Sequence, residues 1–247
     1  MEPYPNPPIR EALIDIKIDP LTPASLGLLE GLHSQLSVQY PVKKIRHRWA
    51  GSVETQEDRL LSAAQKYLGP DGYMFVSSDE QQIVQYRLDG FTFNRLRPYP
   101  RHGWPVVREE ASRLWDLYVS AVNPARAIGL GLRYINEINI PLPDIHLEEY
   151  LTEPPRIPQG LPQTLDQFLT RLVLPFPELD ARAIITQSLG TPHSSNIVSV
   201  ILDIDVLTDV PRKADSATVW SVLDRFRDIK NRIFKSSLSP KTEELFQ

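Results

Sequence analysis

The side chains best suited to hold a ligand or an ion lie on two segments that alternate between apolar and polar residues. In 126–140 the polar positions share their parity with Gly129 and Gly131, and in 196–207 two aspartates share one face. Two glycines on one strand face leave room for a ligand or another backbone, and clustered carboxylates suit hard cations. We therefore expect a polar pocket lined by Arg133, Glu137, Asn139, Asp203 and Asp205.

A simpler interpretation of the same residues is a set of arginine–carboxylate contacts between neighbouring strands. We favour it because no histidine is placed to complete a set of metal ligands. The sequence accordingly predicts no metal site, and metal binding is kept as an alternative.

A second set of candidate residues is basic. Lys44, Arg46 and Arg48 share one face of 43–55, and further arginines share a parity within the segments that follow. If the strands are neighbours, these cations would merge into a patch for the phosphates of a nucleotide or a nucleic acid. The competing interpretation, which the net charge of −4 favours, is a solvated sheet face that discourages edge pairing. The candidate phosphate-binding residues are Lys44, Arg46, Arg48, Arg87, Arg95, Arg97 and Arg101.

Signatures of the common catalytic centres are missing from the sequence. The five histidines stand apart from one another without HExxH spacing, and there is no cysteine. His193 adjoins two serines, but no Gly-x-Ser-x-Gly motif is present. Gly129-Leu130-Gly131 lies inside an expected strand and lacks a third glycine, and no Walker lysine is present. We therefore predict no catalytic residue and no cofactor.

The composition is that of a folded protein, with 41% apolar and 23% charged residues in a chain of 247. The lack of cysteine fits a reducing compartment. The first residues do not combine a basic segment with an apolar run, as a signal peptide does. No apolar stretch approaches the ~18 residues that a membrane span needs. We expect a cytoplasmic protein without a membrane partner.

Apolar–polar periodicity predicts the elements that position these side chains. Strands are expected at 11–19, 43–55, 73–77, 82–88, 91–97, 126–140, 181–189 and 196–207. Helices are expected from Thr22-Pro23, over 104–122, over 165–173, and from Asp215 or Ser216. The segment 56–68 suits a short helix, and Gly69-Pro70-Asp71-Gly72 suits a turn.

The order of these elements indicates an α+β fold in which long amphipathic helices pack on a largely antiparallel sheet. We expect the whole chain, 1–247, to form a single unit. Both halves end in a helix after several strands, so two related β-rich lobes, 1–123 and 124–247, are an alternative. No residue-level similarity between the halves supports a duplication.

Two features indicate contact with another protein chain. Trp220 and Phe234 fall off the apolar stripe of the last expected helix, which predicts either a subunit interface or a second buried face. Prolines gather in 141–177, and such a stretch could present a contact surface.

Several short segments, taken together and in order, carry a family resemblance. They are Asn6-Pro7-Pro8-Ile9 with Glu11-Ala12, Gly72-Tyr73, 94–99, Arg133-Tyr134-Ile135-Asn136, Leu202-Asp203-Ile204-Asp205 and 233–239. The chain resembles, over nearly its whole length, a sporadically distributed family of uncharacterised bacterial proteins of about this size. The resemblance implies a bacterial protein and brings no activity or site residue with it. The patchy distribution of the family suggests an accessory or defence system.

Together these observations predict a non-enzymatic binding or interaction protein that acts through a protein partner or by self-association. The first alternative is a nucleic-acid or nucleotide-binding protein that uses the basic strand face. The second alternative is a metal-dependent phosphodiester enzyme that uses Glu137, Asp203 and Asp205.

Overall fold

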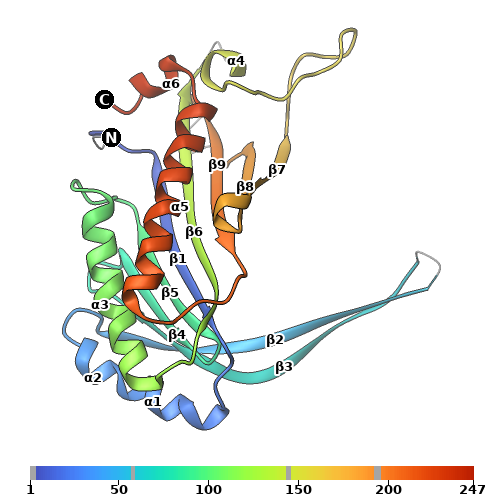
Figure 1. Cartoon of the computed structure of the whole chain (residues 1–247). Coiled ribbons are helices and arrows are strands. Elements are labelled where there is room, and N and C mark those ends of the chain that lie inside the picture. Colours follow the sequence, from blue (N-terminus) through green and yellow to red (C-terminus); the bar gives the residue numbers. More distant parts are fainter. Residues whose placement is uncertain (1–3, 57–58, 143–145, 192–195) are drawn as a thin grey trace.

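One antiparallel sheet of nine strands organises the part of the chain that the computed structural model describes, residues 4–56, 59–142, 146–191 and 196–247 (Figure 1). The strands follow the spatial order β2-β3-β4-β5-β1-β6-β9-β8-β7, which leaves β2 and β7 at the edges. Their bounds are β1 Ile9–Ile18, β2 Val42–Gln56, β3 Arg59–Val76, β4 Gln82–Arg87, β5 Gly90–Leu96, β6 Ala127–Pro141, β7 Leu169–Phe176, β8 Ala181–Leu189 and β9 Ile197–Thr208.

The two longest helices lie beside each other across one face of this sheet (Figure 1). Helix α3 packs on β5, whereas α5 packs on β6 and β9. Among the residues that the structure describes, no helix packs on the opposite face of the sheet (Figure 1). The helices are α1 Leu26–Gly31, α2 His33–Leu36, α3 Trp104–Val122, α4 Leu147–Tyr150, α5 Ser216–Ser237 and α6 Pro240–Glu244, with 3-10 turns at Pro23–Ser25 and Pro177–Leu179.

Strand β1 shows why the two faces of the sheet differ. Ala12, Ile14 and Ile16 alternate along it and are buried under the helices. Because successive side chains of a strand point to opposite faces, Asp15 and Lys17 project toward the helix-free face. Strands β5 and β6 flank β1 and alternate in step with it. Their residues opposite Ile14 and Ile16 face the helices, and those opposite Asp15 and Lys17 face the other side. The helix-free face is therefore polar across the centre of the sheet.

Local sequence signals set the ends of the long helices. The backbone N–H of Thr218 donates to the side chain of Asp215, which caps the start of α5; such a cap stabilises a helix by about 1 kcal/mol. Helix α3 ends at Asn123, which adopts the left-handed conformation with φ 42°. The expected helix over 104–122 and the expected start near Asp215 are confirmed.

Two expected elements near the first hairpin are wrong. Residues 59–68 belong to β3 rather than to a short helix, and Gly69 to Gly72 lie within the same strand rather than in a turn. The cause is β2, which pairs with β3 from Arg59 to Val76 and supplies partners for most of its ladder positions. The turn-forming residues are absorbed as irregularities in the register near His47 and Arg48. Residues 57–58 lie outside the described residues.

The expected helix over 165–173 is also wrong. Its second half is part of β7, which pairs with β8 from Leu169 to Phe176. Pairing with β8 fixes this segment as the edge strand, and Pro175, two residues beyond the expected helix, is compatible with such a strand. The first expected helix does form, although it is broken into a 3-10 turn, α1 and α2.

The expected α+β class with an antiparallel sheet is confirmed. The sheet continues across Asn123-Pro124, because β1 from the first half lies between β5 and β6. A division into two related lobes at that point stays a prediction. Strands β2 and β3 extend well beyond the rest of the sheet as a two-stranded arm (Figure 1).

Candidate functional site

The expected polar residues lie on the helix-free face, but they do not converge on one point. Arg133 pairs with Asp203 through two hydrogen bonds, Nε to Oδ1 at 2.9 Å and Nη2 to Oδ2 at 2.5 Å. Such a bidentate contact is the strongest form of the arginine–carboxylate pair. Asp203 is therefore engaged in a contact between β6 and β9, as the network interpretation predicts.

Asp205 lies next to this pair and has a perturbed acidity. Burial raises the pKa of Asp205 to about 6, and the nearby carboxylates of Asp203 and Asp15 add to the rise while Arg133 opposes it. A carboxyl group with this pKa changes charge close to neutral pH. Its position beside Gly131, where an added Cβ would lie 4.0 Å from its Oδ1, places it on the wall of a groove.

That groove has a volume of about 330 Å³ and runs over Gly129 and Gly131. The space that the two glycines were expected to leave is therefore present. The groove is lined by both acids and bases, and its most buried cation, Arg87, contacts Asp15 at 2.8 Å and Asp89 at 3.0 Å. Because opposite charges already neutralise one another there, the groove offers little net attraction to a charged ligand.

Glu137 and Asn139 lie farther along the same face, in a different hollow. Glu137 contacts Arg97 at 2.7 Å, and the Asn139 side chain accepts a hydrogen bond from Ser199 at 2.7 Å. Within the described residues no group of three or more histidine, aspartate or glutamate side chains could hold a metal ion. The metal-dependent enzyme therefore lacks support from the positions of these carboxylates.

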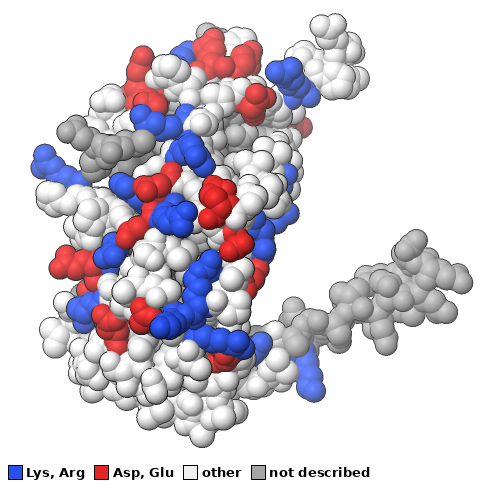
Figure 2. Space-filling model, in the orientation of Figure 1, with Lys and Arg blue, Asp and Glu red and all other residues white. Residues whose placement is uncertain are grey.

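The basic candidates do not form one patch either. Arg46 contacts Asp71 at 3.4 Å, and Arg87 and Arg97 make the ion pairs given above. Arg95 has the opposite orientation: it pairs with Ala12 on the helix side of the sheet and donates to Gln81 and to the carbonyl of Pro98. The exposed candidates are Lys44, Arg48, Arg97 and Arg101, and Arg97 is engaged by Glu137. Figure 2 shows acidic and basic side chains interspersed over the face that carries α3 and α5.

The predicted interface residues are part of the core. Trp220 is 2% exposed, and Arg108 stacks over its ring at 5.5 Å. Phe234 is 7% exposed and lies against Tyr4 and Phe246, with ring centroids 6.4 Å and 6.2 Å away. Arg108 of α3 covers Trp220, and Tyr4 of the N-terminal segment and Phe246, which follows α6, cover Phe234. The interface prediction for them is thus corrected to the alternative, a second buried face of α5.

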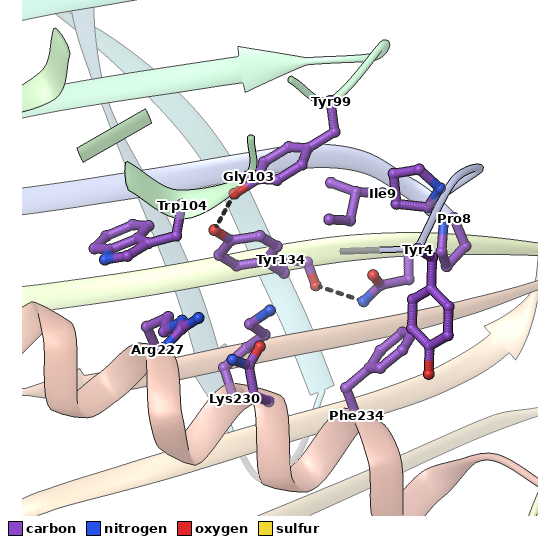
Figure 3. Close-up of a pocket in the computed structure, with 13 residues that line it drawn as sticks. Tyr4, Pro8, Ile9, Tyr99, Gly103, Trp104, Tyr134, Arg227, Lys230 and Phe234 are labelled. Carbon is purple, nitrogen blue, oxygen red and sulfur yellow. Dashed lines mark hydrogen bonds between the residues drawn. The ribbon is translucent and has the colours of Figure 1, made fainter. Parts of the chain in front are cut away.

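A pocket of about 100 Å³ opens beside Phe234 (Figure 3). Five aromatic side chains from the N-terminal segment, the loop before α3, the start of α3, β6 and α5 form its walls. They are Tyr4, Tyr99, Trp104, Tyr134 and Phe234. The sequence predicted no site here, because the residues come from five separate segments.

Lys230 lies at the floor of this aromatic pocket. Its side chain is 9% exposed, and its ammonium lies 3.9 Å from the centroid of the Tyr134 ring. Burial lowers the pKa of Lys230 to about 7, and the positive charge of Arg227 adds to the shift. A signal was present in the sequence: Lys230 falls four residues after Phe226 and three before Ile233, in the buried stripe of α5.

The edge strand β7 is a second feature that the sequence analysis did not predict. Its side chains are exposed on both faces of the sheet, and Leu169, Leu172 and Val173 are 72%, 49% and 48% exposed. Because β7 pairs only with β8, its outer backbone groups have no strand partner among the described residues. An apolar edge of this kind is suited to pair with another strand.

Comparisons with protein families and with curated proteins found no match for this chain. None of the helices in the described part of the chain combines the length and the apolar character needed to cross a bilayer.

Proposed function

We propose that the protein is a non-enzymatic interaction protein that self-associates by pairing β7 with the β7 of a second copy. The observation that carries the proposal is the double exposure of this strand, which lies within the proline-rich stretch 141–177. Leu172, Val173 and Leu174 are 49%, 48% and 39% exposed, so covering each contributes roughly 1 kcal/mol before the costs of association.

The sequence of β7 suits pairing with itself. An antiparallel pair around a two-fold axis places each residue opposite one of equal parity. A register centred on Leu172 sets Arg171 opposite Val173, and a register centred on Val173 sets Arg171 opposite Pro175. Both registers keep the one charged residue of β7 away from its own copy, so apolar side chains meet across the axis.

The other edge of the sheet is less suited to this role. Strand β2 carries Lys43, Lys44, Arg46 and Arg48. Two copies paired along this segment would bring like charges together, which opposes association. The self-association surface therefore lies at β7.

The mass of the protein in solution at micromolar concentration tests the proposal. We expect a dimer in native mass spectrometry and in light scattering, and a monomer for Val173→Lys. The matched control is Val38→Lys, which places the same charge at an apolar side chain 92% exposed and far from β7 in the sequence; it should stay dimeric. A monomeric unmodified protein, or a dimeric Val173→Lys variant, would contradict self-association through β7.

Self-association through β7 does not depend on where the protein acts. The cytoplasm, the bacterial source and the defence context are expectations from the sequence and from the family resemblance. A protein partner, the other route expected for an interaction protein, would use the same exposed edge by adding a strand to it. A monomeric protein whose β7 binds no second copy would favour that route.

A further inference from the structure

We infer that the aromatic pocket beneath the N-terminal segment binds a small organic anion, a carboxylate on an apolar body, with Lys230 and Arg227 as its cationic contacts. This site is separate from β7, and neither the interaction function nor the polar groove requires it.

The charge balance of the pocket is the first argument. Its lining includes the two cations Arg227 and Lys230 and no acidic residue. In the described part of the chain, no carboxylate lies within ion-pair distance of the Lys230 ammonium, which lies over the face of the Tyr134 ring, 3.9 Å from its centroid. A buried charge without a counter-ion is costly, and an anion in the pocket would offset that cost.

The acids around the pocket are already engaged. Asp224 accepts hydrogen bonds from Trp104 Nε1 at 2.8 Å and from Arg108 Nε at 3.0 Å. Asp228 contacts Arg227 at 3.1 Å on the exposed side of α5. Asp228 offsets part of the charge of Arg227, but neither carboxylate forms an ion pair with the ammonium of Lys230, so the charge of that ammonium is not cancelled from the rim.

Hydrogen-bond donors are available at the same place. The hydroxyls of Tyr99 and Tyr134 lie 2.7 Å apart and bond to each other. One hydroxyl donates to the other, which leaves a single O–H free to donate to a ligand oxygen. Burial raises the pKa of Tyr99 to about 12, and that of Tyr134 also rises, so both stay protonated at neutral pH. Figure 3 shows Arg227 and Lys230 reaching from α5 toward this pair of tyrosines.

The walls of the pocket determine the kind of anion. Tyr4, Trp104 and Phe234 present aromatic surface to the cavity. A strongly hydrated phosphate would lose its water against these walls without replacement, whereas a carboxylate on an apolar body would bury its body against them. The volume of about 100 Å³ is smaller than the ~150 Å³ cavity that holds benzene in another protein. The buried part of the ligand is therefore no larger than one small ring or a short chain.

Binding should be coupled to protonation of Lys230. The charged and titratable groups that face its ammonium are Arg227 on α5, Tyr134 on β6 and Tyr99 before α3, with Tyr4 farther along the wall. Glu243 on α6 acts on Tyr4, whose pKa burial raises to about 12. In the protein without ligand, the Lys230 amine has a pKa of about 7 and is about half protonated at pH 7. A bound anion favours the charged ammonium, so binding at pH 7 should be accompanied by uptake of roughly half a proton. Affinity should fall as the pH rises above 7.

Calorimetric titration with benzoate, cyclohexanecarboxylate and butyrate tests the inference, with benzamide as the uncharged analogue of benzoate. We expect at least one of the carboxylates to bind at millimolar concentration or below, with proton uptake in buffers of different ionisation enthalpy. Benzamide should bind about tenfold more weakly than benzoate or not at all.

Two variants separate the ligand contacts from general effects on the fold. Lys230→Met should weaken carboxylate binding by about tenfold or more and abolish proton uptake. Arg227→Met should weaken binding and reduce proton uptake at pH 7 without abolishing it, because loss of the Arg227 charge raises the pKa of Lys230. The control Lys235→Met removes an exposed lysine of the same helix and should change neither. The inference is overturned if none of the three carboxylates binds, if benzamide binds as tightly as benzoate, or if folded Lys230→Met binds like the unmodified protein.

Discussion

Replacing Lys230 with methionine should remove a pH dependence from the stability of the fold. The pKa of this amine is lowered from 10.5 to about 7 in the folded chain. Between these values the unfolded chain binds more protons than the folded one, so the free energy of unfolding rises with pH. From pH 7 to pH 9 the rise from this one group is about 2 kcal/mol.

Other contributions to this pH dependence are small or act elsewhere. The contact of the ammonium with Tyr134 favours the charged form and is worth roughly 1 kcal/mol, so it reduces the rise. The raised pKa values of Tyr99 and Tyr134 make the folded state less stable only as the unfolded tyrosines ionise, near pH 10. Asp205 titrates below pH 7. The interval from pH 7 to pH 9 thus isolates Lys230.

Urea unfolding at pH 7, 8 and 9 measures the effect. For the unmodified protein and for the control Lys235→Met, we expect the free energy of unfolding to rise across the series. For Lys230→Met it should be nearly flat and higher at pH 7, because methionine fills the same space without a charge. Parallel curves for all three proteins would refute the assignment of a buried, largely unpaired amine, as would a loss of stability at pH 7 in Lys230→Met.

Three further predictions concern other positions. Asp205→Asn should be more stable than the unmodified protein by about 3 kcal/mol at pH 7. Most of this gain should be lost near pH 4, because the raised pKa of Asp205 lowers stability as the pH rises from 3.8 to about 6; urea unfolding at both pH values checks this. Gly90→Ala should cost several kcal/mol, because an added Cβ would lie 2.2 Å from the Ile16 carbonyl oxygen, whereas Gly27→Ala meets no atom and should be neutral or stabilising in thermal unfolding. Asp215→Ala should cost about 1 kcal/mol in the same assay through loss of the cap on α5.

The sequence predicts best where one local signal decides the structure. The alternation of buried isoleucines in β1 and the capping residue Asp215 are signals of this kind. The prediction for 59–72 is wrong, because the residues of this segment favour a helix and a turn, whereas pairing with β2 makes it a strand. Pairing between segments distant from each other cannot be read from either segment alone.

The candidate sites follow the same rule. Parity correctly placed Arg133, Asp203 and Asp205 on one sheet face, since parity is a property of a strand by itself. The favoured interpretation also expected arginine–carboxylate contacts between neighbouring strands, such as that of Arg133 with Asp203, but parity did not predict that Arg95 would point to the opposite face from Arg87. The aromatic pocket was beyond such reasoning, because only the folded chain brings its separate segments together.

Lys230 remains the residue at which local sequence and packing disagree most. The stripe of α5 that begins at Val219 and includes Phe226 and Ile233 is apolar and buried, and a methionine at position 230 would complete it at lower cost. A protein is expected to depart from the stable choice mainly where function requires it. An ammonium kept in an aromatic pocket, next to Arg227 and without a carboxylate partner among the described residues, has a physical reason to be there if an anion completes the site.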